Sequence, residues 1–403
     1  MAVLPFDNRS KDPEQEFFVD GLTEEIITEL SRFKDLDVIA RNSTFQYKGQ
    51  SVDVRQVGQE LGARYVLEGS VRKVGNALRV TGQLLDAADG SHLWAETYDR
   101  DLSKTSIFDV QDEISGRLGS IIGDLFGVLK QVHFEKLKQE DLQNLDSGQS
   151  VAYALATLQR TGYHMGAREV LERATGRDPN NGNVWALLTH AYIDEYTSGQ
   201  EPSTKTLDRA FDAAQKAVDF EPTSDRAHSS LGRAYFYRGE TMAALKESER
   251  AVQINPNSAV RITQHAYYLC LSGNWELGLE TYKNDVVVAE AMHSLQALRH
   301  IPLFLDHYQE GRYEDALKSA HKFEGAKRVW AIHACLAATY GQLDNKEKAN
   351  VEITQLLELR PEFNEDPKGY LQRFLGSLEG VDILSEGLRK AGLNIRDDFT
   401  NNQ

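Results

Sequence analysis

The first 130 or so residues alternate between short apolar runs and amphipathic stretches. Val3–Phe6 is a short apolar run, and Asp7–Ser10 supplies turn residues. From residue 17 to residue 33 apolar side chains recur at helical spacing, which predicts an amphipathic helix with Glu24 and Glu25 early in it. Val38–Ile39 is predicted to be a second strand, and residues 54–61 a short helix.

The next segment carries a β-hairpin pattern. Tyr65–Val74 and Ala77–Asp86 are rich in Val and Leu and flank a Gly-Asn pair, which is typical of two antiparallel strands. His92–Tyr98 is predicted to be a further strand, and apolar positions from Ile107 to Leu129 predict a long amphipathic helix. The order β-α-β-α-β-β-β-α predicts an α/β domain with a mixed sheet.

The remainder of the chain has a helical repeat. Pro222 and Pro256 lie 34 residues apart, as do Gly239 and Gly273, and 34 is the period of tetratricopeptide (TPR) repeats. Two units show the spacing of that motif clearly, at Trp185, Leu188, Tyr192, Ala210, Ala217 and Pro222, and at Leu231, Gly232, Tyr235, Ala244, Ala251 and Pro256. We predict about six stacked hairpins, because a single hairpin cannot bury its apolar face.

These patterns predict a domain organisation. We expect an α/β domain over residues 1–138, a polar linker over 139–150, and an all-α TPR superhelical array with C-terminal capping helices over 151–391. An insertion around 198–203 lengthens one repeat, and Gly392 is a predicted helix stop. Because a strand-like run follows Met1 at once, we expect an upstream partner or segment.

Composition narrows the class of protein. With 45 Lys and Arg against 61 Asp and Glu, the formal charge of −16 would repel nucleic-acid phosphates, so direct DNA or RNA binding is not expected. The two cysteines, Cys270 and Cys335, are predicted to be buried and unpaired. No apolar run reaches the roughly 18 residues of a membrane helix, and no signal peptide is apparent, so we expect a cytoplasmic chain.

A family resemblance covers roughly residues 1–130. Successive blocks resemble those of the TolB-like domain, in order Val3–Asn8, Phe17–Glu24, Val38–Ser43, Asp53–Gly58, Tyr65–Val71 and Leu93–Glu96. The resemblance implies a domain that commonly follows a class III adenylate cyclase domain, or a winged-helix DNA-binding domain in CadC-like regulators, and that TPR repeats usually follow. It implies no catalytic residue.

The chain carries no recognisable catalytic motif. GxxxxGK[ST], GxGxxG, HExxH and GxSxG are absent, and Gly376–Gly380 places its serine wrongly for a nucleophile elbow. The eleven histidines are scattered and lack the convergent spacing of metal ligands. We therefore expect no cofactor, no metal and no enzymatic activity in this chain.

One candidate site is a polar loop after the predicted second strand. It mixes cations, hydroxyls and aromatic rings at Arg41, Asn42, Ser43, Thr44, Phe45, Gln46, Tyr47 and Lys48. Loops at the C-terminal ends of strands often hold ligands in α/β folds, which favours a small-ligand or partner contact. The alternative is hydrogen bonding that fixes a long loop.

The stronger candidate is the concave groove of the repeat array, which the first helix of each hairpin lines. The TPR groove positions correspond here to His190, Asp194, Arg226, Arg233, Tyr237, Thr263 and Tyr267. Arginines beside tyrosines suit an acidic or carboxylate-ended peptide. We expect Arg226 and Arg233 to be exposed, so that reversing their charge weakens partner binding and changes stability by less than about 0.5 kcal/mol.

The favoured interpretation is a non-catalytic sensory or scaffold module that binds a protein or peptide and couples it to an output domain. A first alternative is the regulatory C-terminal part of a class III adenylate cyclase, which would connect the chain to cyclic AMP signalling. A second alternative is the regulatory part of a CadC-like transcriptional regulator, which would place the module in the periplasm.

Overall fold

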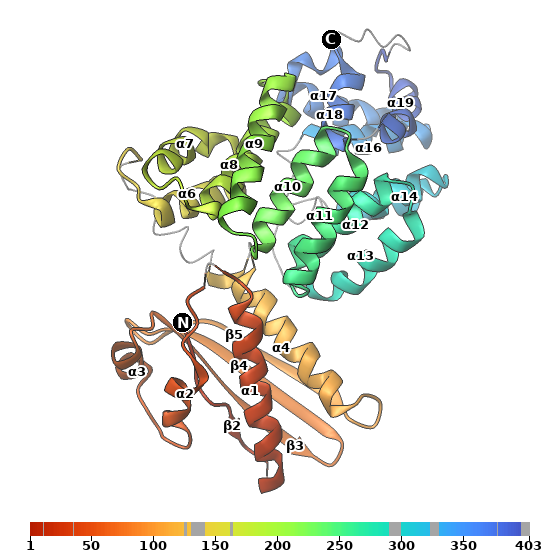
Figure 1. Cartoon of the computed structure of the whole chain (residues 1–403). Helices are drawn as coiled ribbons and strands as arrows, with labels where there is room; N and C mark the ends of the chain where they lie inside the picture. Colours follow the sequence, from red (N-terminus) through yellow and green to blue (C-terminus); the bar gives the residue numbers. More distant parts are fainter. Residues whose placement is uncertain are drawn as a thin grey trace. The chain divides into compact units, whose positions relative to one another are not determined.

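The computed structural model describes residues 1–10, 12–34, 36–124, 127–129, 142–161, 164–289, 300–322, 330–376 and 378–395. The chain divides into two compact units, Met1–Val132 and His133–Gln403. The first unit is an α/β domain with a mixed sheet, and the second is an all-α array of TPR-like hairpins (Figure 1). The predicted fold class is confirmed.

The sheet of the first unit joins parallel and antiparallel strands. Its strands are β1 (Ala2–Val3), β2 (Asp7–Asn8), β3 (Tyr65–Val74), β4 (Ala77–Asp86) and β5 (Ser91–Asp101). Both β1 and β2 pair with β3 in parallel, whereas β3, β4 and β5 are antiparallel neighbours. The predicted hairpin is confirmed, and Gly75 at its turn has a φ of +58°, a conformation that glycine adopts without strain.

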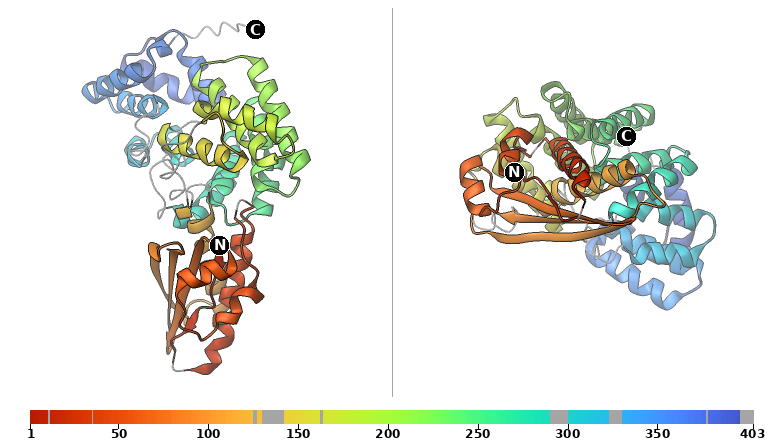
Figure 2. Two further views of the ribbon diagram at one scale, coloured as in Figure 1. Left: turned by 90° about the vertical axis from the view of Figure 1, so that its left-hand side faces the viewer. Right: turned by 90° about the horizontal axis from the view of Figure 1, so that it is seen from below.

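Two helices cover one face of this sheet. α1 (Glu16–Ser31) and α4 (Ile107–Gly123) lie side by side (Figure 2). Their buried apolar side chains form the main core with the strands. A Cβ atom at Gly123 would lie 2.7 Å from the ring of Phe33, so glycine allows the two segments to approach closely. A smaller core lies under α2 (Arg41–Thr44), the 3₁₀ turn η2 (Phe45–Tyr47) and α3 (Val54–Leu61).

Three predicted elements differ from the structure. Val38–Ile39 is not a strand. Ile39 donates one hydrogen bond to the Met1 carbonyl at 2.8 Å, and the chain enters α2 two residues later, at Arg41. Asp7–Asn8 is strand β2 rather than part of a turn. The long helix ends at Gly123, short of the predicted Leu129, and Leu125 lies outside the described residues.

The second unit is a succession of antiparallel helix pairs. In order, its helices are α6 (Ser147–Thr161), α7 (Arg168–Arg177), α8 (Gly182–Ser198), α9 (Thr204–Phe220), α10 (Asp225–Tyr237), α11 (Thr241–Ile254), α12 (Ala259–Leu271), α13 (Trp275–Ala289), α14 (Ile301–Gln309), α15 (Tyr313–His321), α16 (Trp330–Gln342), α17 (Lys346–Leu359), α18 (Pro367–Leu375) and α19 (Leu378–Ala391). The pairs from α6–α7 to α16–α17 are the hairpins that the 34-residue period predicted.

Small residues and glycine turns build these hairpins. A Cβ atom at Gly232 would lie 3.2 Å from the carbonyl oxygen of Ala244, so α10 and α11 approach through small side chains. Gly239, Gly273 and Gly311 each follow the first helix of a pair with φ of +78°, +91° and +72°. Because these values favour glycine, the repeated glycine spacing in the sequence marks the hairpin turns.

The predicted linker is described only in part. Residues 139–141 lie outside the described residues, and α6 begins at Ser147, inside the predicted linker. The residue position of the domain boundary therefore stays a prediction.

Two expectations drawn from composition can be compared with the structure. Cys270 and Cys335 are free and buried, as predicted, and burial raises the pKa of both thiols to about 12. Over the described ranges, no helix combines the length and the apolar character needed to cross a membrane.

Candidate functional site

The predicted groove residues lie on the first helices of three consecutive hairpins, α8, α10 and α12. We call the side of these helices that carries His190, Arg233 and Tyr267 the inner face. One part of it is a buried polar network, and another part contacts α18. The two parts have different chemistry.

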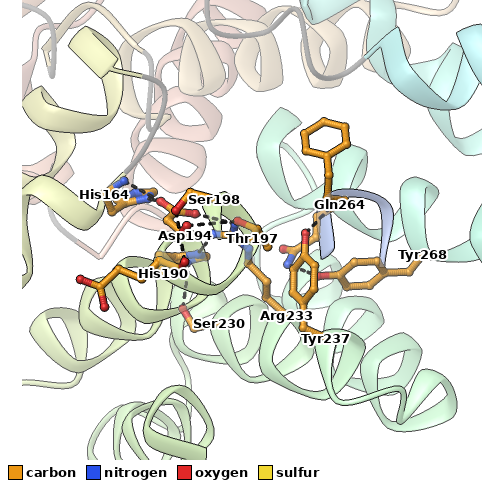
Figure 3. A network of polar contacts seen from close by, with 12 residues as sticks. His164, His190, Asp194, Thr197, Ser198, Ser230, Arg233, Tyr237, Gln264 and Tyr268 are labelled. Atoms are coloured by element: carbon orange, nitrogen blue, oxygen red, sulfur yellow. Dashed lines mark hydrogen bonds and ion pairs between the residues drawn. The ribbon is translucent and has the colours of Figure 1, made fainter. Parts of the chain in front are cut away.

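Asp194 is the centre of the polar network (Figure 3). Its Oδ1 accepts a hydrogen bond from Nη2 of Arg233 at 2.7 Å, and its Oδ2 lies 2.9 Å from Nδ1 of His164. The backbone N–H of His164 also donates to Oδ2. His164 precedes α7 and comes from a different hairpin, so the network joins the α6–α7 connection, α8 and α10.

The hydrogen bonds determine the protonation state of His190. Nη1 of Arg233 lies 2.7 Å from Nδ1 of His190, and because a guanidinium can only donate, Nδ1 must accept. The ring proton is therefore on Nε2, which lies 3.2 Å from Oγ of Ser230. Burial, followed by the charge of Arg233, lowers the pKa of His190 well below its usual value. His190 is neutral and serves as a fixed acceptor between α8 and α10.

Asp194 and Arg233 form a buried ion pair. Burial alone would raise the pKa of Asp194, but the Arg233 charge and the hydrogen bonds from His164 hold it below its usual value. The side chain of Asp194 is 4% exposed and that of Arg233 is 20% exposed. The charge of Arg233 is thus matched inside the protein, and the network fixes helices to one another rather than presenting a nucleophile.

The expectation that Arg226 and Arg233 are exposed is wrong. Arg226 is 9% exposed, and its Nη1 donates to Oδ1 of Asn183 on α8. Both arginines occupy the contact between α8 and α10, because stacking brings neighbouring first helices together at these positions. The small stability change expected for charge reversal therefore no longer holds. Whether the inner face binds a partner stays a prediction.

Two predicted groove tyrosines contact α18. The hydroxyl of Tyr237 lies 3.4 Å from the Phe374 carbonyl oxygen, and the hydroxyl of Tyr267 lies 2.9 Å from the Leu375 carbonyl oxygen. Burial raises the pKa of both tyrosines, so both hydroxyls keep their protons and donate. Thr263, the remaining predicted groove residue, is half-buried on α12.

A second polar connection was not predicted. Nε of Arg261 donates to Oδ2 of Asp225 at 2.8 Å, and Arg261 also contacts Oγ of Ser229. These residues join α10 to α12, as does the hydrogen bond from Gln264 to the Ser229 carbonyl at 3.0 Å. Asp225 and Arg261 lie about one repeat apart, and opposite charges at that spacing are the signal that could have identified them.

The predicted ligand loop consists of the helical turns α2 and η2. Nζ of Lys48 lies 2.6 Å from Asp20, and the guanidinium of Arg41 lies 3.8 Å from the centre of the Phe45 ring. Tyr47 is 8% exposed. The two cations of the segment thus make internal contacts, which agrees with the alternative interpretation of a fixed segment. A ligand-binding role for residues 41–48 stays a prediction.

Comparison with known proteins gives two sequence similarities. Residues 1–117 match the family described as HilA/YgeH-like transcriptional regulator, second domain. A protein of Rhizobium meliloti (strain 1021) named "Putative adenylate cyclase 3" is 39% identical over 259 residues, which is 62% of this chain and 42% of that protein. The chain thus spans less than half the length of this relative.

Solved structures resemble the chain at low sequence identity. The Cut9–Hcn1 hetero-tetramer structure of the APC/C has 12% identity and a TM-score of 0.45, covering 70% of this chain and 49% of that chain. YrrB, titled a TPR protein with an unusual peptide-binding site, has 16% identity and a TM-score of 0.29, covering 51% of this chain and 97% of that chain.

Proposed function

We propose that this chain is a non-catalytic sensory and protein-interaction module. It binds a protein or peptide partner through the inner face and couples that binding to an output domain. The observation that carries the proposal is the stack of hairpins, which gathers polar and aromatic side chains from α8, α10 and α12 on one face. Stacked repeats of this kind provide extended binding surfaces.

The contacts on this face favour one kind of partner. The charge of Arg233 is neutralised by Asp194, and Arg226 donates to Asn183, so neither is an open site for a carboxylate. Tyr237 and Tyr267 instead donate to backbone carbonyl oxygens. We therefore propose recognition of a partner's main chain and apolar side chains in place of an acidic peptide.

The output domain is proposed from sequence similarity. The 39% identity with "Putative adenylate cyclase 3" supports the regulatory part of a class III adenylate cyclase, with the cyclase domain outside this chain. The match of residues 1–117 to the HilA/YgeH-like second domain supports the alternative, the regulatory part of a CadC-like transcriptional regulator. We also propose that the first unit is a TolB-like domain, which fits either output domain.

The binding role is tested with a pair of matched variants of the full chain. Thr263→Arg places a long cation on α12, and Thr281→Arg places the same side chain on α13, the second helix of the same hairpin. We expect proteins captured from the native cell to be lost with Thr263→Arg and retained with Thr281→Arg. Equal capture by both variants would refute binding through the inner face.

The two output domains are distinguished in the native cell with the Thr263→Arg allele. A changed cyclic AMP level supports the cyclase association. A changed transcript profile at an unchanged cyclic AMP level supports the transcriptional one. No change in either readout refutes the coupling to an output domain.

A further inference from the structure

The last turn of α18 is bound by the inner face. The carbonyl groups at a helix C-terminus have no partners within the helix, and those of Phe374 and Leu375 accept hydrogen bonds from Tyr237 and Tyr267. These contacts join residues 137 and 108 positions apart in the sequence. The tyrosines therefore act as a cap for a helix that comes from the far end of the chain.

The fit between α18 and the inner face is close. Gly376 ends α18 with a φ of +68°, and a Cβ atom there would lie 2.1 Å from the Phe236 ring. At the end of α8, a Cβ atom on Gly199 would lie 2.7 Å from the Tyr370 ring. Leu375 is fully buried. Glycine at both contact points indicates a shaped receptor for a helix and the residue that follows it.

The other C-terminal helices contact one another directly, and α18 packs against α19 in the same core. α16 packs against both α17 and α19. A Cβ atom at Gly341 on α16 would lie 2.1 Å from the Gly387 carbonyl oxygen on α19, so these two backbones are in direct contact. The Trp330 ring contacts Tyr370 and Phe374 of α18, and it also lies 5.5 Å from the ring of Phe363, which precedes α18. If α18 leaves, the contacts of α16 with α17 and α19 remain, whereas the contacts that Tyr370, Leu371 and Leu375 make in the terminal core are lost.

We propose that the inner face is a receptor for a short helix and that α18 is its resident intramolecular occupant, which a partner helix must displace. This inference rests on the proposed function of the inner face. The partner it fits is a helical segment with an aromatic residue at the position of Tyr370, which meets Gly199, and a glycine helix stop at the position of Gly376, which meets Phe236. A tethered occupant competes at a high effective concentration, so it lowers the apparent affinity of the partner.

The test uses a fluorescent synthetic peptide with the sequence of residues 366–377 as the probe. In the full chain, Gly376→Val should expel α18, because the added side chain meets Phe236. The matched control is Gly239→Val, since Gly239 has a similar φ of +78° and no atom within 4 Å of a Cβ there. We expect the peptide to bind Gly376→Val about ten-fold or more tightly than it binds either wild type or Gly239→Val. Equal affinities would overturn the proposal.

Hydrogen–deuterium exchange of the wild-type chain supplies a test that needs no variant. In urea below the unfolding transition, amides of α18 should exchange before those of α16 and α19. Exchange of all three helices together would overturn the proposal, because α18 would then leave only on global unfolding. If a natural partner is lost with Thr263→Arg and α18 stays protected in its complex, the proposed function stands and this inference fails.

Discussion

Replacing Arg233 with Met tests the account of the buried network. The substitution keeps much of the side-chain length but removes the charge that faces Asp194. Oδ1 of Asp194 loses its hydrogen bond at 2.7 Å, and Nδ1 of His190 loses the donor at the same distance. The bonds from His164 to the other carboxylate oxygen remain.

The magnitude follows from the burial of the remaining carboxylate. Removing one partner of a buried ion pair typically costs about 3–5 kcal/mol, since the other charge stays without compensation. The Asp194 side chain is 4% exposed, so water compensates little of the loss, whereas the hydrogen bonds from His164 compensate part of it. We therefore expect Arg233→Met to lower the free energy of unfolding by about 3 kcal/mol.

Urea unfolding followed by far-UV circular dichroism measures this loss. Arg238→Met is the control, because Arg238 at the end of α10 contacts surface carboxylates and is partly exposed. This substitution should lower the free energy of unfolding by no more than about 1 kcal/mol. The double variant Arg233→Met/Asp194→Leu removes both buried charges and should recover more than half of the lost stability. A loss for Arg233→Met no larger than that for Arg238→Met would refute the reasoning.

Three further outcomes are expected. Because folding lowers the pKa of His190, the unfolded chain binds a proton that the folded chain does not. The free energy of unfolding should therefore fall as the pH drops below about 6.5. Denaturation curves of His190→Gln should show a flatter dependence on pH. The pKa values of Cys270 and Cys335 are raised to about 12, so both thiols should resist a thiol reagent at pH 8 until urea unfolds the chain. Rapid labelling of the native protein would contradict their burial. Gly69→Ala should lower the melting temperature, since its Cβ would lie 2.3 Å from a phenyl ring, whereas Gly176→Ala, with no atom within 4 Å, should not.

Local patterns in the sequence were enough to identify most elements. The Gly75-Asn76 pair predicted the β3–β4 hairpin, and the glycine spacing around Gly239 predicted the hairpin turns. These features depend on residues close in sequence, whose backbone preferences act wherever the segment lies. Strand pairing was harder to predict. Whether Val38–Ile39 and Asp7–Asn8 form strands depends on which backbone, distant in the sequence, lies beside them.

The candidate site depended on tertiary structure to a greater degree. The groove positions of the TPR motif placed His190, Arg233 and Tyr267 on one face, but they did not reveal that Arg233 is paired or that α18 covers part of that face. His164 carries no motif, and it reaches Asp194 only because stacking brings two hairpins together. The sequence by itself determined the repeat period, and through its resemblance to the TPR motif it indicated which side of each first helix turns inward. The stacking of the whole array decided what each inward side chain meets, because those contacts join residues from 30 to 137 positions apart.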